Sequence, residues 1–89
     1  MADKILSIIN EKGLHARASA KFVEVVEAHD AEAHVTKDGM TVSGDSIMGL
    51  LMLAASRGTS IEVRTTGTEA GPLAAALCAL VASRFGEDY

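Results

Sequence analysis

Two kinds of hydrophobic repeat alternate closely along this chain, and this alternation limits its fold more than any other feature of the sequence. In residues 60–65 every second side chain is apolar or threonine, which predicts a strand with one buried face. In residues 16–29 apolar side chains recur every three or four positions, which predicts a helix with one buried face. Because the chain has only 89 residues, we expect both kinds of element to share one core in a single domain, residues 1–89.

The remaining segments complete an alternating order of strands and helices. Further strands are predicted at residues 4–9, 33–37 and 40–43, and further helices from residue 45 or 46 to 57 and at residues 69–85. Asp38 and Gly39 separate two of the strands and are typical of a tight hairpin in which both residues have positive φ. Gly58 is the expected stop of the short helix.

The order β-α-β-β-α-β-α predicts an α+β domain in which helices cover one face of an antiparallel sheet. The pattern does not determine the order of the strands within that sheet. A ferredoxin-like split fold with an extra helix fits the same order of elements.

Charge and apolar runs exclude several classes of protein. With 8 basic and 12 acidic residues and a net charge of −4, the chain lacks the basic balance of a nucleic-acid-binding protein. The longest apolar run, residues 47–55, is too short to span a bilayer, and the N-terminus lacks the pattern of a signal peptide. Cys78 is the single cysteine and cannot form an internal disulfide, so we expect a cytoplasmic protein, with a monomer as the default.

The strongest candidate for chemistry lies between the first predicted strand and the first predicted helix. Gly13 permits a turn that places His15 at the helix N-cap or beside it. Unpaired backbone N–H groups and the positive end of the helix dipole attract anions there, and the guanidinium of Arg17 suits the paired oxygens of a phosphate. The positive helix end also disfavours an imidazolium, so we expect a neutral, nucleophilic ring. The pattern predicts phosphoryl transfer through His15.

Taken alone, His15 also has a simpler explanation, because an isolated histidine near a helix start is more often an ordinary polar cap. A metal site is not predicted, since the histidines do not have the spacing of metal ligands. His29 and His34 are expected on the surface. Cys78 is expected to be a small buried apolar residue, and residues 87–89 are expected to form a frayed tail.

Two segments together resemble one known family. The sequence Gly-Leu-His-Ala-Arg at residues 13–17 is similar to the active-site signature of the HPr family, the histidine-containing phosphocarriers of the phosphoenolpyruvate-dependent phosphotransferase system. The sequence Ser-Gly-Asp-Ser-Ile-Met-Gly-Leu at residues 43–50 resembles the regulatory-serine segment of that family. The resemblance extends over nearly the whole chain and includes the order of elements.

This resemblance implies a fold and a function. The fold would be an open-faced β-sandwich, with a four-stranded antiparallel sheet, three helices on one face and the fourth strand between the first and the second. His15 would accept a phosphoryl group on Nδ1 from phosphorylated enzyme I, Arg17 would contact that group, and an enzyme IIA-type protein would receive it. The chain would be a stoichiometric carrier rather than an enzyme, and no cofactor is implied.

One position departs from the commonest pattern of the family. Many members have a proline directly after the active-site arginine, where this chain has Ala18. Alanine is an excellent helix former, so the helix should persist. Similar signatures occur in the nitrogen-related, regulatory branch of the system. A mainly regulatory binding module is therefore a second hypothesis, and a purely structural ferredoxin-like domain is a third.

Ser46 opens the short predicted helix and has two interpretations. Serine is among the best N-cap residues, which explains its presence without any modification. The resemblance implies instead that HPr kinase/phosphorylase phosphorylates Ser46 in organisms that have this enzyme. A phosphate fits a helix N-terminus, so we expect the fold to tolerate it.

Residues 47–53 are apolar nearly all round, which is unusual for a helix on the surface. We expect Leu50 and Leu53 to enter the core and other members to remain exposed as a surface for partners. The resemblance places the docking surface for enzyme I and enzyme IIA on Ala16, Arg17, Ala20, Ile47, Met48 and Leu51.

Overall fold

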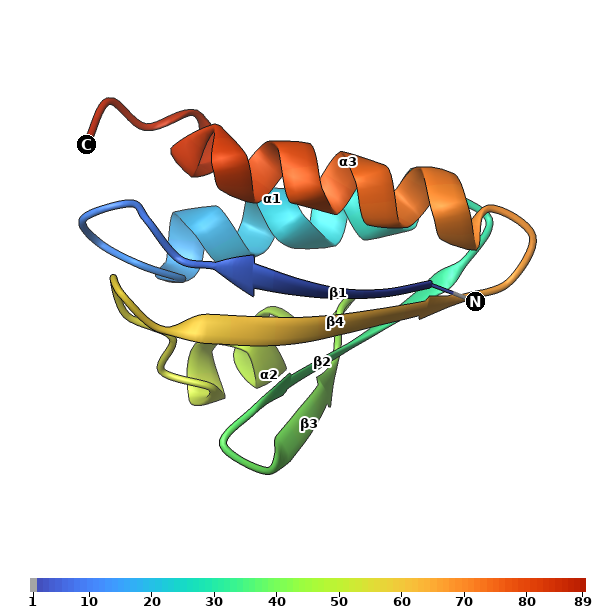
Figure 1. The fold of residues 1–89 in the computed structure, drawn as a ribbon, viewed down its shortest axis with the longest axis horizontal. Coiled ribbons are helices and arrows are strands. Elements are labelled where there is room, and N and C mark those ends of the chain that lie inside the picture. Colours follow the sequence, from blue (N-terminus) through green and yellow to red (C-terminus); the bar gives the residue numbers. More distant parts are fainter. Residues whose placement is uncertain (1) are drawn as a thin grey trace.

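The computed structural model describes residues 2–89, and its elements follow the predicted order (Figure 1). The strands are β1 (Ala2–Ser7), β2 (Glu32–Lys37), β3 (Met40–Ser43) and β4 (Ser60–Thr66). The helices are α1 (Ala16–Glu27), α2 (Ile47–Met52) and α3 (Ala70–Ala82), and the short 3-10 turn η1 (Arg84–Gly86) follows α3. Within the described part of the chain, no helix combines the length and the apolar character needed to cross a membrane.

The four strands form one antiparallel sheet in the order β1-β4-β2-β3. The last strand in sequence therefore lies between the first two, as the family resemblance implies. Val63 at the middle of β4 is opposite Lys4 of β1 and Val35 of β2. The hairpin between β2 and β3 turns at Asp38 and Gly39, whose φ values of 51° and 82° confirm the predicted turn.

The alternation of side chains along the strands divides the sheet into a covered face and an open face. On β4 the side chains of Ile61 and Val63 are buried, whereas Glu62 between them is exposed, as the sequence predicts. On β1 the exposed fraction of Ile5 is 74%. The helices therefore cover only one side of the sheet, and α1 and α3 run side by side over it (Figure 1).

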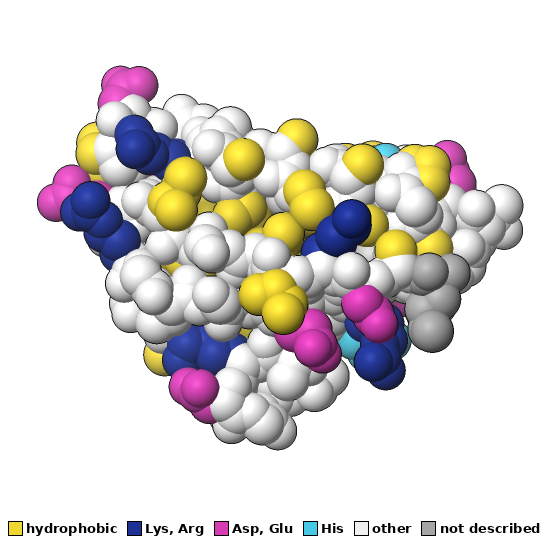
Figure 2. All heavy atoms as spheres, in the orientation of Figure 1, with side chains coloured by type: hydrophobic (Ala, Val, Ile, Leu, Met, Phe, Trp, Pro, Cys, Tyr) yellow, Lys and Arg dark blue, Asp and Glu magenta, His cyan; other side chains and the backbone are white. Residues whose placement is uncertain are grey.

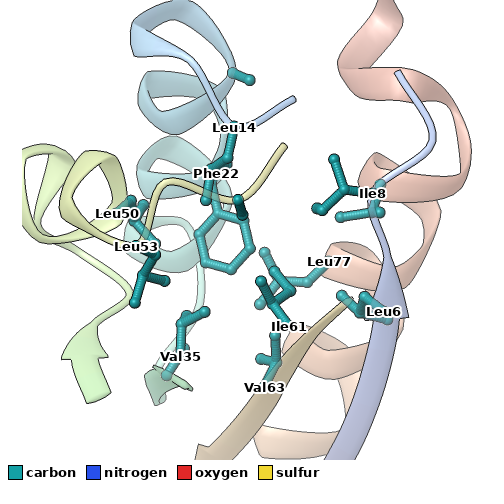
Figure 3. Close-up of a cluster of buried hydrophobic side chains, with 14 of the residues drawn as sticks. Leu6, Ile8, Leu14, Phe22, Val35, Leu50, Leu53, Ile61, Val63 and Leu77 are labelled. Atoms are coloured by element: carbon teal, nitrogen blue, oxygen red, sulfur yellow. The ribbon is translucent and has the colours of Figure 1, made fainter. Parts of the chain in front are cut away.

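The short helix α2 joins the same layer beside α1. Leu50 and Leu53 are buried in one cluster with Val35 of the sheet and Phe22 of α1, which confirms the prediction for the two leucines. Figure 3 shows side chains from the helices and from the sheet pointing into the space around Phe22. A core with so few aromatic residues depends on this ring and on Phe85 for its largest side chains.

Helix α2 is shorter than predicted, and its end matters for the site. It stops at Met52 rather than near residue 57, because Ala54 adopts a left-handed φ of 51° that ends the helix. The chain then turns Ala55 into the core, and Gly58 lies in the loop leading to β4. The apolar pattern correctly indicated buried residues, but it could not show that they lie on a loop.

The predicted bounds of three other elements also differ from the structure. Strand β1 covers Ala2–Ser7 rather than residues 4–9, and α1 ends at Glu27 rather than 29. Helix α3 ends at Ala82 rather than 85, because Arg84 and Phe85 have left-handed φ values of 58° and 56°. This turn brings Phe85 into the core, fully buried.

Candidate functional site

His15 is the N-cap residue of α1, as the sequence predicts. Its backbone is extended, with φ −79° and ψ −177°, and its side chain makes no capping hydrogen bond. The first hydrogen bond of the helix runs from the N–H of Ser19 to the carbonyl of His15, at 2.8 Å. The N–H groups of Ala16, Arg17 and Ala18 come before that bond and have no helical acceptor. They can therefore donate hydrogen bonds to the oxygens of an anion bound beside His15.

The loop before His15 is locked against the loop after α2. The N–H of Leu14 donates to the carbonyl of Ala55 at 2.9 Å, and the side chain of Leu14 is buried. Gly13 has a left-handed φ of 64°, and a Cβ at this position would lie 2.5 Å from the oxygen of Ala55. Only glycine permits such a close approach, so Gly13 and Ala55 together fix where His15 begins the helix.

A shallow hollow of about 230 Å³ opens beside the imidazole. Its lining residues come from the loops before α1 and after α2: Lys12, Leu14, His15, Ala54, Ala55 and Ser56. The side chain of His15 is 27% exposed, so the ring is accessible from outside. Lys12 adds a positive charge to the rim, where it can attract an anion.

Arg17 follows at the second position of α1, and its side chain is exposed. Within residues 2–89 its guanidinium forms no ion pair with a carboxylate. Ala18 is fully buried in the first turn, and the helix forms there without a proline, as expected. The first turn of α1 therefore combines unpaired N–H groups with a free cationic side chain.

Two residues of the site were missed by the sequence analysis. Glu87, expected in a frayed tail, is half-buried and contacts the Nε2 atom of His15 through Oε2. Its other oxygen, Oε1, accepts a hydrogen bond from the Nδ2 of Asn10 at 3.0 Å. Asn10 is fully buried and also donates to the carbonyl of Gly13 at 2.8 Å. The sequence contains one signal that the chain end is anchored: the large apolar Phe85 is followed directly by Gly86.

The surroundings of Glu87 favour its ionised form. Burial alone would raise the pKa of Glu87, but hydrogen bonds from Asn10 and His15 and the positive charges of His15 and Lys12 outweigh burial and lower the pKa. An ionised carboxylate can only accept hydrogen bonds. A hydrogen bond between these two groups therefore requires Nε2 of His15 as the donor.

Ser46 is the N-cap residue of α2, as predicted. Its Oγ accepts a hydrogen bond from the backbone N–H of Gly49 at 3.0 Å. Its side chain is half-buried beside the exposed start of the helix. This bond shows the ordinary capping role of Ser46 directly.

The residues predicted as a docking surface differ in exposure. Ala16 and Arg17 are exposed at the start of α1, whereas Ala20 and Leu51 are half-buried. Ile47 and Met48 of α2 are 41% and 69% exposed, which is high for such apolar side chains. Helices α1 and α2 pack against each other, so these residues lie on neighbouring elements. We name this set of six, Ala16, Arg17, Ala20, Ile47, Met48 and Leu51, the α1–α2 surface.

The other histidines and the cysteine lie apart from this site. His34 is exposed on the open side of β2, and His29 is half-buried, with its Nδ1 2.7 Å from the carbonyl oxygen of Val25. Cys78 is half-buried against the core rather than fully buried as expected, because α3 presents it at the edge of its apolar stripe. Among residues 2–89 no three His, Cys, Asp or Glu side chains gather as a metal-ligand group would. Figure 2 shows basic and acidic side chains interspersed on the viewed face.

Comparison with known proteins agrees with the fold and identifies the family. The family model described as "PTS HPr component phosphorylation site" matches residues 2–83. The phosphocarrier protein HPr of Neisseria meningitidis is 46% identical over 87 residues, covering 98% of both chains, and the phosphocarrier protein NPr of Escherichia coli is 38% identical over 84 residues, covering 93% of both. The crystal structure of HPr-C-His from Thermoanaerobacter tengcongensis superposes with a TM-score of 0.95 at 34% identity, over the full length of both chains. The chain therefore belongs to the HPr family of phosphotransferase-system phosphocarriers, which are phosphoryl carriers rather than enzymes.

Proposed function

We propose that His15 accepts a phosphoryl group on Nδ1 from phosphorylated enzyme I and passes it to an enzyme IIA-type protein, in the cytoplasm. The observation that carries this proposal is the position of His15 at the N-cap of α1 without a capping bond. The ring is accessible there, and the N–H groups of the first helical turn are available to the oxygens of a transferring phosphoryl group. Arg17 supplies a free guanidinium in the same turn.

The test is labelling of the purified protein. We would mix it with a cognate enzyme I, Mg²⁺ and phosphoenolpyruvate and measure by intact mass spectrometry an added phosphoryl group that is lost in acid. His15→Ala should abolish the added mass. His34→Ala is the matched control, because His34 is an exposed histidine on the open face of the sheet, and this variant should label fully. A wild type that a competent cognate enzyme I does not label would refute the proposal.

The α1–α2 surface is the proposed docking site for both partners. Ile47 and Met48 expose apolar area on α2, which packs against α1, and exposed apolar clusters of this kind often bind proteins. Met48→Asp should slow transfer in both directions and leave the fold intact. Ala75→Asp, an exposed position on α3, is the control with the same added charge. Equal transfer rates for Met48→Asp and wild type would contradict this assignment.

Ser46 is the proposed regulatory residue, modified by a serine kinase of the HPr kinase/phosphorylase type where the host has one. Its hydroxyl lies directly before Ile47 and Met48, so a phosphate on it would place negative charge within the α1–α2 surface. Phosphorylated Ser46 should slow labelling of His15 through repulsion at the interface without unfolding the protein. Labelling of the phosphoserine form at the unmodified rate would contradict this prediction.

A mainly regulatory role, acting through phosphorylation state rather than sugar transport, is the second candidate function. It is supported by Ala18 in place of the common proline and by similarity to the Escherichia coli protein named NPr. Transfer from the labelled protein to a sugar-specific enzyme IIA and to a nitrogen-type enzyme IIA would be compared. Fast transfer to the nitrogen-type acceptor alone would favour the regulatory role.

A further inference from the structure

The end of the chain folds back onto the proposed phosphorylation site. Glu87 and His15 are 72 positions apart in sequence, yet their side chains are in direct contact. The exposed fraction of the Glu87 side chain is only 10%, and both of its oxygens have partners, Asn10 on one and His15 on the other. An ordinary surface ion pair has mobile, well-hydrated groups and contributes little. This carboxylate is instead held in place by a buried amide.

The turn before Glu87 fixes its position. Phe85 is fully buried in the core and has a left-handed backbone, as does Gly86 with φ 78°. The Nζ of Lys21, from α1, donates to the carbonyl of Phe85 at 2.6 Å. The buried side chain of Phe85 and the ammonium of Lys21 therefore both anchor the η1 turn. Glu87 follows this anchored turn directly, and its side chain contacts His15, the N-cap residue of α1.

We propose that Glu87 is a positioning residue for phosphoryl transfer, which keeps the proton of His15 on Nε2 and leaves Nδ1 as the nucleophilic nitrogen. This inference rests on the proposed function of His15. The ionised carboxylate accepts the Nε2 proton in a hydrogen bond, and no side chain of residues 2–89 hydrogen-bonds to Nδ1. A carboxylate that holds one ring nitrogen of a histidine sets both the tautomer and the orientation of the ring.

The transfer step gives the carboxylate a second role. The lone pair of Nδ1 forms the new bond to phosphorus while the bond from phosphorus to the donor atom breaks, and the electron pair of that bond stays on the donor. No proton moves, so the ring keeps its Nε2 proton and becomes positively charged as the phosphoryl group is gained. Glu87 lies next to this developing charge and stabilises it. The retained proton also keeps the ring a good leaving group for onward transfer.

The experiment has one readout that does not depend on phosphorylation. In the unphosphorylated protein, proton NMR of the His15 ring should show a slowly exchanging Nε2 proton. Glu87→Ala should lose this resonance, whereas Glu87→Gln, which keeps an amide oxygen as acceptor, should retain it. An Nε2 resonance in Glu87→Ala identical to that of wild type would overturn the inference.

The second readout is the single-turnover rate of labelling by phosphorylated enzyme I. Removing a carboxylate that orients a functional histidine costs about tenfold or more in comparable metal-site pairs. We expect a loss of that size in the rate constant for Glu87→Ala, a partial recovery in Glu87→Gln, and an unchanged enzyme I concentration at half-saturation. Asp88→Asn, which removes the neighbouring exposed charge, is the control and should match wild type.

The outcomes separate this inference from the function on which it rests. A wild type that is not labelled at all overturns the proposed function of His15. A wild type that is labelled, with Glu87→Ala and Glu87→Gln both labelled as fast as wild type, overturns the role of Glu87 alone. A rate loss in Glu87→Ala that Glu87→Gln partly restores, together with loss of the Nε2 resonance in Glu87→Ala, supports it.

Discussion

Two features require a glycine at position 13: a left-handed backbone and a close approach to the loop after α2. Replacing Gly13 by alanine should incur the cost of both. The backbone of Gly13 is left-handed, with φ 64°, and its α-carbon lies against the backbone of the loop after α2. An added Cβ would be 2.5 Å from the oxygen of Ala55 and 2.9 Å from the Cα of Ser56. Both neighbours are backbone atoms, so the contact cannot be relieved by rotating a side chain.

The expected cost has two parts. An alanine in the left-handed region costs roughly 1–2 kcal/mol. Forcing the loop away to make room adds about 1–3 kcal/mol, the usual cost of overpacking. The displaced loop includes the carbonyl that accepts the Leu14 N–H, so the same shift should disturb the bond that places His15 at its N-cap. The total loss of unfolding free energy is about 2–5 kcal/mol.

Comparison with a second left-handed glycine, Gly39, isolates the overpacking part of this cost. Gly39 also has a left-handed φ, 82°, but no heavy atom of the described residues lies within 4 Å of a Cβ placed there. Gly39→Ala should therefore cost only the backbone part. Thermal unfolding followed by circular dichroism should give a melting temperature at least about 4 °C lower for Gly13→Ala than for Gly39→Ala. Labelling of His15 should be slower in Gly13→Ala only.

Equal melting temperatures for the two variants would refute this reasoning. It would mean that the loop after α2 yields without cost, and that Gly13 does not position the site through Ala55. Slow labelling of Gly39→Ala would also contradict it, because a Cβ at Gly39 meets no heavy atom of the described residues within 4 Å.

Three further perturbations test other parts of the structure. Phe85→Ala, which empties a fully buried site, should lower the free energy of unfolding in urea by about 3–5 kcal/mol. The folded pKa of Glu87 lies below its usual 4.5, so Glu87 stabilises the fold above that pH, and the contribution is lost as the pH falls through the lowered folded pKa. Glu87→Gln should be less stable than wild type at neutral pH, and the two should converge in acid. Ser46→Ala removes the capping bond to Gly49 and should cost about 1 kcal/mol in thermal unfolding, whereas Ser46→Asp should retain most of the cap.

The features predicted correctly from the sequence depend on local backbone chemistry. Asp38 and Gly39 specify their hairpin because few residue pairs accept positive φ at both positions. The start of α1 at His15 follows from the turn permitted by Gly13, and the buried face of β4 follows from strict alternation. In each case the information lies within a few neighbouring residues. The order of the strands came from the family resemblance instead.

The features that were missed depend on contacts between distant segments. Apolar residues at 53 and 55 fit a longer helix equally well, and only the left-handed Ala54 and the docking against Leu14 make this segment a loop. Phe85 likewise fits the helical pattern of α3, but in the structure it enters the core from the η1 turn that follows the helix. Periodicity shows that a side chain is buried and not which element carries it.

His15 is subject to two opposing electrostatic influences, and their combination suits a reversible carrier. The N-terminus of α1 disfavours a positive ring, while the carboxylate of Glu87 favours it from the Nε2 side. Before the proposed transfer, the N–H groups of the first turn of α1 are available to the oxygens of an incoming phosphoryl group. After transfer the phosphoryl oxygens would offset the positive helix end, and the carboxylate then stabilises the charged ring. In the proposed transfer, a site that stabilised only one of these states would hold its phosphoryl group too tightly or fail to accept it, whereas the helix end and Glu87 together would keep both steps accessible.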